Sequence, residues 1–104
     1  MPGEVLVIIH HQARDEDEWA AIQQAYRQVS SRLAGVPGLL GNELMRSAAD
    51  PSSVAVVSRW RDLAAFQEWE QGGAHRETTA SLRPYRDSRL PVPFGVYRIE
   101  AAYH

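Results

Sequence analysis

Apolar residues open the chain in an unbroken run, and this run predicts the first element of structure. Residues 4–11 read Glu-Val-Leu-Val-Ile-Ile-His-His and are rich in β-branched side chains, which favour a strand. Side chains alternate along a strand, so Val7 lies on one side while Leu6 and Ile8 lie on the other. The first strand is therefore apolar on both faces, and each face needs a cover.

The next apolar positions recur at three- and four-residue steps and predict a helix. Asp15 and Glu18 precede them with the N-cap and N3 spacing of a capping box, inside an acidic cluster that suits a helix N-terminus. The apolar stripe that follows comprises Trp19, Ile22, Tyr26, Val29 and Leu33. Gly35 and Pro37 indicate where the helix ends, after about five turns.

Two further strand-like runs predict a β-hairpin. They cover residues 39–47 and 54–60, and residues 49–52, Ala-Asp-Pro-Ser, form a turn sequence between them. The two strands are therefore expected to pair with each other.

A second helical region and a last strand complete the pattern. Asp62 can cap a helix whose apolar positions are Leu63, Phe66 and Trp69. Gly72 and Gly73 predict a break before a further helical piece over residues 74–82. Prolines and charges make residues 84–93 a loop, and residues 94–103 alternate as a final strand.

The resulting order, βαββαβ, is that of the split-βαβ, ferredoxin-like α+β fold. Two helices pack on one face of a four-stranded antiparallel sheet, and residues 1–104 form a single domain. The helices leave the second apolar face of the sheet uncovered. Burying that face against the same face of another copy predicts a homodimer.

Composition narrows the classes of function. The chain has 104 residues, 44% hydrophobic and 23% charged, as in an ordinary globular domain. Its net charge is −2 and its arginines are scattered, so nucleic acid is not an expected partner. It has no cysteine, and its longest apolar run is far shorter than the ~20 residues of a membrane helix. We expect a cytoplasmic protein without a membrane partner.

No strong catalytic motif is present in the sequence. It contains no Walker loop, no glycine-rich dinucleotide turn, no HExxH and no serine elbow. His10 and His11 are adjacent in a strand and point to opposite faces, so they cannot bind one metal ion together. No metal site is predicted.

Two polar side chains stand out in the hairpin. Asn42 lies between Leu40 and Leu44 on one side of its strand, so a buried face would place an amide among apolar groups. Asn42 would then either contact a substrate, or bond to nearby backbone or sit in a bulge beside Gly41. Trp60 ends the next strand, where it either offers its indole N–H to a cavity or belongs to the core.

The second helical region offers a further group of candidates. His75 follows the glycine break and can act as a base or hydrogen-bond donor near neutral pH, although a surface histidine capping the segment fits the pattern as well. Tyr85, in the following loop, can fold over a pocket mouth. Arg59 and Tyr97 are weaker polar candidates, because strands of such sheets commonly carry solvated arginine and tyrosine.

Three segments together resemble the antibiotic biosynthesis monooxygenase (ABM) family. They are the Pro-Gly entry to the second strand at residues 37–44, the strand and helix over residues 56–69, and Ala74-His75-Arg76. The shared pattern is a strand ending in tryptophan, a helix with two spaced aromatic residues, and a histidine six positions after the second. The resemblance extends from Val5 to Tyr103.

This resemblance implies a dimeric α+β barrel and a cofactor-independent monooxygenase of secondary metabolism, such as antibiotic biosynthesis, that acts on a polycyclic phenolic or quinone-type molecule. Molecular oxygen is then the co-substrate, because an ionised phenol can itself reduce it in a dry pocket. Asn42 and Trp60 would hydrogen-bond substrate oxygens, and His75 or Tyr85 would assist proton transfer. The apolar wall would comprise Phe66, Trp69, Leu40 and Leu44, with Tyr97 as a further contact.

Two alternatives follow from the same resemblance. The chain can be a non-oxidative cyclase or isomerase, or a small-metabolite-binding protein, because fold does not fix function. Haem-degrading members resemble it less, since the position of their ligating histidine is Thr79 here.

Overall fold

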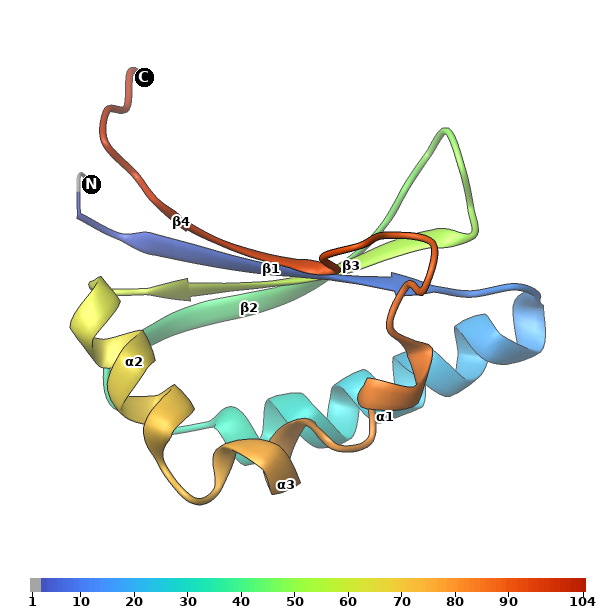
Figure 1. Ribbon diagram of the computed structural model, residues 1–104, viewed down its shortest axis with the longest axis horizontal. Helices are drawn as coiled ribbons and strands as arrows, with labels where there is room; N and C mark the ends of the chain where they lie inside the picture. Colours follow the sequence, from blue (N-terminus) through green and yellow to red (C-terminus); the bar gives the residue numbers. More distant parts are fainter. Residues whose placement is uncertain (1–2) are drawn as a thin grey trace.

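The chain folds into an open four-stranded antiparallel sheet with all of its helices on one face, as the computed structural model of residues 3–104 shows (Figure 1). The sheet has the strand order β2-β3-β1-β4, which confirms the predicted ferredoxin-like fold. The elements in chain order are β1 (Val5–Gln12), α1 (Glu16–Leu33), β2 (Leu39–Arg46), β3 (Ser53–Trp60), α2 (Leu63–Gln71), α3 (His75–Thr79), the 3-10 helix η1 (Arg83–Tyr85) and β4 (Phe94–Arg98).

Helix α1 begins at the predicted cap but without a full capping box. The Asp15 carboxylate accepts from the backbone N–H of Glu18 at 2.8 Å, as an N-cap should. The Glu18 carboxylate does not return to Asp15, because it accepts from the backbone N–H and the guanidinium of Arg14 instead, at 2.8 and 2.7 Å. These hydrogen bonds from Arg14 lower the pKa of Glu18 to about 2.

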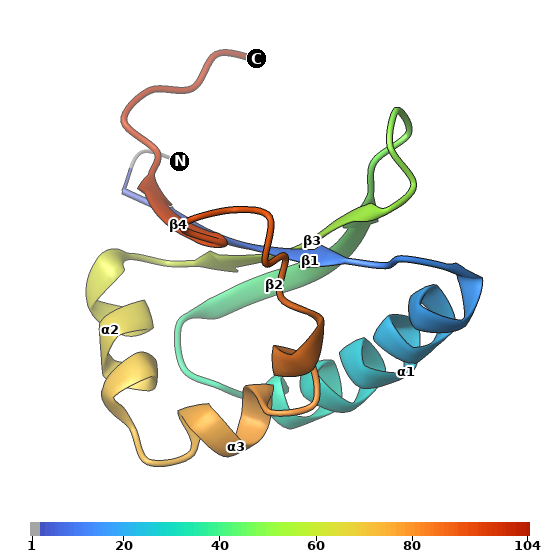
Figure 2. The ribbon, with the colours of Figure 1, turned by 45° about the vertical axis from the view of Figure 1, so that its right-hand side comes forward.

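The helices bury two apolar clusters against the sheet. One lies under α1 and comprises Ala13, Ile22, Ala25, Val29, Leu33, Val54 and Leu82. The other lies under α2 and comprises Val5, Val7, Trp60, Ala65 and Phe66. The predicted helical stripes therefore face the sheet, with the helical layer curving beneath it (Figures 1 and 2).

Gly38 fixes the approach of β2 to helix α2. Its φ of +82° is one that side chains other than glycine rarely adopt, and a Cβ at this position would collide with the Cβ of Ala65. The Gly38 carbonyl accepts from the backbone N–H of Arg61 at 2.8 Å. The entry to β2 is thus held against the start of α2.

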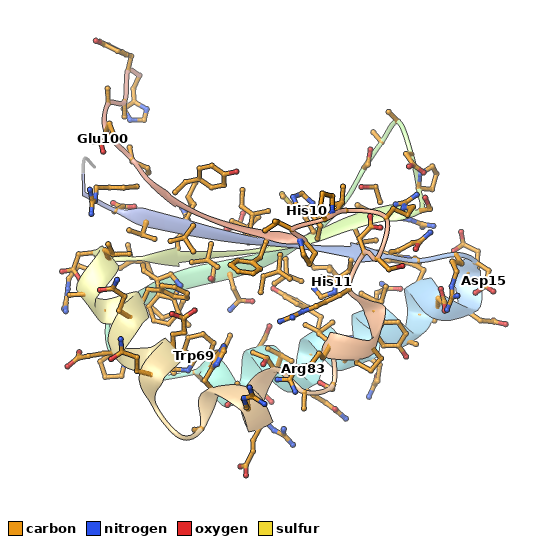
Figure 3. All side chains as sticks on the ribbon, viewed as in Figure 1. His10, His11, Asp15, Trp69, Arg83 and Glu100 are labelled. Carbon is orange, nitrogen blue, oxygen red and sulfur yellow. The ribbon has the colours of Figure 1, made fainter. Side chains whose placement is uncertain are left out.

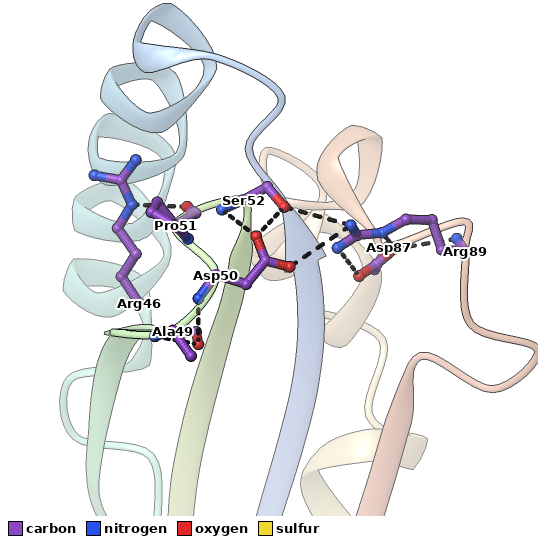
Figure 4. Close-up of polar contacts among 8 residues, drawn as sticks. Arg46, Ala49, Asp50, Pro51, Ser52, Asp87 and Arg89 are labelled. Atoms are coloured by element: carbon purple, nitrogen blue, oxygen red, sulfur yellow. Dashed lines mark hydrogen bonds and ion pairs between the residues drawn. The ribbon is translucent and has the colours of Figure 1, made fainter.

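An ionic cluster connects the β2–β3 turn to the loop that follows η1 (Figure 4). Arg89 donates from Nε to the Asp87 carboxylate at 2.8 Å and reaches Ser52 Oγ at 3.3 Å. Asp50 accepts from Ser52 Oγ at 2.7 Å and lies 3.9 Å from the Arg89 guanidinium. Asp87 is only 3% exposed, and its pKa is lowered by the hydrogen bonds from Arg89.

The last strand is shorter than the sequence predicted. A strand over residues 94–103 is wrong beyond Arg98. The last backbone hydrogen bonds of this segment join Ile99 to the Glu4 carbonyl at 2.8 Å and Gly3 to the Ile99 carbonyl at 3.0 Å. Residues 100–104 have no strand beside them in the described part of the chain and leave the sheet (Figures 1 and 2). Likewise the predicted helix over residues 74–82 ends at Thr79 and continues as turns.

Among residues 3–104, no helix is both long and apolar enough to cross a membrane.

Candidate functional site

A cavity of about 120 Å³ lies between the sheet and the helical layer. Most of its wall is apolar and includes Val7, Ile9, Val29, Val56, Phe66 and Trp69. The polar groups on the wall are His11, Tyr26, Asn42, Ser58, His75 and Thr79. Charged side chains from the helical region, Glu70, Arg83 and Arg86, complete it. A mostly apolar pocket with a few polar groups is typical of a small-molecule site.

Asn42 faces the cavity from β2 and is held in place by α1. Its side-chain oxygen accepts from the Ser30 hydroxyl at 2.9 Å, and its backbone carbonyl accepts from the Tyr26 hydroxyl at 3.2 Å. The partner of this amide within the chain is therefore a serine side chain. The Asn42 NH₂ group has no hydrogen-bond partner in the described part of the chain, and it remains available to a ligand.

Trp60 lies behind the cavity wall instead of on it. It is fully buried, and its indole N–H donates to Ser58 Oγ at 2.9 Å. Its ring packs against Phe66 and Trp69, with centroid distances of 5.6 and 5.3 Å. The expected direct hydrogen bond from Trp60 to a substrate does not fit this placement, because Ser58 occupies the cavity surface.

His75 packs edge-on against Trp69 on the helical side of the cavity. The ring centroids lie 4.5 Å apart with an interplanar angle of 82°. Burial lowers the pKa of His75, and the nearby Glu70 carboxylate opposes that shift. A neutral imidazole can accept a proton, so this position suits a general base.

His11 is a cavity residue that the sequence reading did not select. It is 2% exposed, and neither ring nitrogen has a hydrogen-bond partner among the described residues. Burial, and next the charge of Arg86, lower its pKa to about 4, while the nearby Tyr85 carbonyl opposes the shift as a hydrogen-bond acceptor without making a hydrogen bond of regular geometry to either nitrogen. Strand alternation could have identified His11 from the sequence, because alternation places it on the same side of β1 as Val7, which is the side that faces the helices.

Opposite orientations of the two adjacent histidines are visible in Figure 3. His10 points away from the helices, whereas His11 points into the space where Trp69 and Arg83 also lie. The expectation that the two side chains cannot meet at one metal ion agrees with this arrangement. No group of three or more histidine, cysteine, aspartate or glutamate side chains among residues 3–104 is placed to hold a metal ion.

Four of the expected site residues line the cavity: Asn42, Phe66, Trp69 and His75. Four others besides Trp60 do not. A bulge between Leu39 and Gly41 leaves Leu40 53% exposed, and Tyr97 is 60% exposed opposite Leu6 on the outer face.

Leu44 and Tyr85 are the remaining two. Both pack against the cluster under α1, and Tyr85 lines a separate shallow hollow with Gln12 and Pro84 instead of the cavity mouth. Arg59, a weaker candidate, pairs with Glu43 at 3.5 Å away from the cavity.

Comparison with known proteins gives one family. The model of the family described as antibiotic biosynthesis monooxygenase, ABM, matches residues 4–81. Protein SchA of Streptomyces halstedii is 31% identical over 94 residues, which is 90% of this chain and 24% of SchA. The 42.8 kDa protein in the whiE locus of Streptomyces coelicolor is 31% identical over 58 residues, 56% of this chain and 15% of that protein. The chain thus spans a quarter or less of these curated relatives.

Solved structures share the fold at low sequence identity. SnoaB, a cofactor-independent oxygenase from Streptomyces nogalater, superposes with a TM-score of 0.75 at 16% identity, over 96% of each chain. A conserved protein from Methanosarcina mazei superposes with a TM-score of 0.73 at 12% identity, over 91% of each chain.

Proposed function

The chain belongs to the antibiotic biosynthesis monooxygenase family, and on that premise we propose that its cavity binds a polycyclic phenolic or quinone-type molecule and catalyses its oxidation by dioxygen. The reaction would need no bound metal, flavin or haem. The observation that carries the proposal is the cavity itself, an apolar space that brings Asn42 and His75 to one ligand.

For this chemistry the protein needs to supply only a pocket that excludes water and carries a few polar groups on its wall. An anthrone-type substrate loses a proton from its ring methylene, and the resulting carbanion transfers electrons to dioxygen. One oxygen atom becomes the new ring carbonyl, and the other leaves as water with the two methylene hydrogens. Pocket donors lower the barrier by stabilising the anion that forms first.

Three polar groups of the cavity have a place in this scheme. The free NH₂ of Asn42 and the hydroxyl of Ser58 donate to the substrate oxygen that becomes negative. His75, whose pKa is lowered by burial, accepts the methylene proton. Phe66 and Trp69 contact the flat faces of the ring system. Tyr85, which lies outside the cavity, leaves the proton transfer to His75.

Oxygen consumption tests the proposal directly. Protein stripped of metals should consume one dioxygen per molecule of a hydroxyanthrone, and Asn42→Ala should lower kcat/KM by about 10- to 100-fold. His75→Gln should lower kcat with little change in KM. Oxygen uptake equal to that of buffer would overturn the proposal, and ligand binding without uptake would favour a non-oxidative cyclase, isomerase or metabolite-binding protein.

The proposal includes a second copy of the chain on the outer face of the sheet. Leu6, Ile8, Met45 and Tyr97 define this outer patch, and Met45 and Tyr97 are exposed. No helix of residues 3–104 covers the patch (Figure 1). Packing of two such faces would remove apolar surface from water under closed two-fold symmetry.

A further inference from the structure

We infer that His11 is a ligand-binding residue whose imidazole hydrogen-bonds a ring oxygen of the aromatic molecule in the cavity. The inference rests on the proposed small-molecule function of the cavity, but it does not depend on the oxygen chemistry. No role is assigned to this strand by the family resemblance or by the chemistry proposed for Asn42 and His75.

The first observation is that both imidazole nitrogens of His11 are buried without a hydrogen bond of regular geometry. Within the described part of the chain the nearest acceptor is the Tyr85 carbonyl, which affects the pKa of the ring but does not satisfy either nitrogen in regular geometry. Buried polar groups are nearly always hydrogen-bonded, and leaving one unpaired costs free energy. The neighbouring cavity residues Ile9, Val29 and Phe94 are apolar, so packing alone would be served better by another apolar side chain. The histidine is explained if a ligand supplies the missing partner.

The second observation is that the imidazole is held by a rigid frame. His11 pairs with Val54 on β3, and its other edge forms an isolated bridge with Arg86. The backbone N–H of Asp87 donates to the His10 carbonyl at 3.1 Å, which fixes the same stretch. A group on a strand held from both edges is preorganised for binding, since little motion remains to be lost.

The surroundings of His11 define the chemistry of its partner. Burial keeps the imidazole neutral near pH 7, so one nitrogen donates a hydrogen bond and the other accepts one. The Arg86 side chain lies on the same cavity wall and has no ion-pair partner in the described part of the chain. A neutral donor beside a cation favours an oxygen with negative character. A phenol that shares or loses its proton fits this position.

Binding of two probes that differ by one oxygen tests the inference. Calorimetric titration with 1-naphthol and with naphthalene, without any turnover, measures the value of the hydroxyl. Wild-type protein should bind 1-naphthol about tenfold more tightly than naphthalene. His11→Phe should bring this ratio close to one while it retains naphthalene binding. The matched change His10→Phe, on the opposite side of the same strand, should leave the ratio unchanged.

Imidazole nitrogen NMR gives a second measurement that needs no variant in the folded core. Addition of 1-naphthol to ¹⁵N-histidine-labelled wild-type protein should shift the His11 nitrogens, while naphthalene should not. Equal binding of the two probes, no binding of either, an unchanged ratio in folded His11→Phe or a silent His11 signal would each overturn the inference. Oxygen uptake with a hydroxyanthrone is scored separately, so loss of the oxygenase proposal leaves this result standing.

Discussion

The hydroxyl of Ser30 on α1 donates to the side-chain oxygen of Asn42 on β2, across 2.9 Å. In this arrangement the amide oxygen accepts from Ser30, which leaves the NH₂ group for the cavity. A helix residue far from Asn42 in sequence thereby determines the polarity that the cavity presents.

Ser30 is therefore expected to act as a positioning residue for Asn42. Ser30→Ala should lower kcat about 3- to 10-fold, because the freed amide can rotate, whereas Ser30→Thr keeps a hydroxyl and should restore most of the rate. Steady-state oxygen uptake measures both variants. Ser31→Ala, on the exposed side of α1, is the matched control and should behave as wild type. Equal rates in Ser30→Ala and wild type would contradict the positioning role.

His11 should make the fold sensitive to mild acid. Its folded pKa of about 4 lies below the unfolded value of 6.5, so the unfolded state binds more protons between these pH values. Stability should therefore fall as the pH drops from 6.5 to 4, by up to about 3 kcal/mol in total. In His11→Phe the free energy of unfolding should no longer show this part of its pH dependence, and the variant should be more stable than wild type at pH 5.

Urea unfolding of wild type and His11→Phe at pH 7 and pH 5 measures the difference in slope. The carboxylates with lowered pKa, such as Asp87, are common to both proteins and lose their contribution at lower pH. Parallel pH profiles for the two proteins would show that His11 is not buried as a neutral group.

Among the carboxylates, the loss of Asp87 should lower the free energy of unfolding most. It is buried and accepts two hydrogen bonds of 2.8 Å from Arg89, which itself remains partly exposed. Asp87→Asn should lower the free energy of unfolding by about 1–3 kcal/mol, since the guanidinium loses a charged partner. Glu43→Gln, which breaks an exposed pair with Arg59, should cost less than about 0.5 kcal/mol in the same denaturation assay. A reversed order of the two costs would refute this assignment.

Gly38 should tolerate no side chain. Gly38→Ala introduces a methyl group at a positive φ and against Ala65, so it should destabilise the fold by at least about 2 kcal/mol. Gly73→Ala meets no atom within 4 Å and should change stability by less than about 0.5 kcal/mol. Thermal unfolding of the two variants makes the comparison, and similar melting temperatures would be inconsistent with the close approach of β2 and α2.

Disruption of the outer patch should separate the proposed dimer. Ile8→Lys places a charge at the centre of the patch, where a partner's apolar face would have to bury it, so the variant should sediment as a monomer. Gln67→Lys, on the exposed side of α2, should leave the oligomeric state unchanged. Sedimentation at micromolar concentration measures both, and a monomeric wild-type protein would remove the dimer from the proposal.

Periodicity in the sequence was sufficient to predict the fold. The three- and four-residue steps of Ile22 and Val29 placed α1 on the sheet, and alternation along β1 put His10 and His11 on opposite faces. The site was predicted only in part, because its details depend on departures from regular periods. The bulge at Leu40 displaces that side chain from the face of Asn42, and only the partner strand reveals such an irregularity.

The hydrogen-bond partners of buried side chains could not be predicted from the pattern of residue types either. An indole N–H can donate to a ligand in a cavity or to a neighbouring side chain. The Trp60 indole donates to Ser58 because packing against Phe66 and Trp69 fixes its rotamer. The end of β4 depends likewise on where β1 stops supplying backbone partners.

The hydrogen bond between Trp60 and Ser58 means that a change in a buried residue behind the cavity wall can alter the hydrogen-bonding groups that the cavity presents. The indole N–H donates to Ser58 Oγ and so restricts the rotation of a hydroxyl that lines the cavity. A phenylalanine at position 60 would preserve every atom that a ligand touches, yet it would release that hydroxyl to rotate. The selectivity of the cavity for its ligands can therefore change through substitutions at residues that do not contact the ligand.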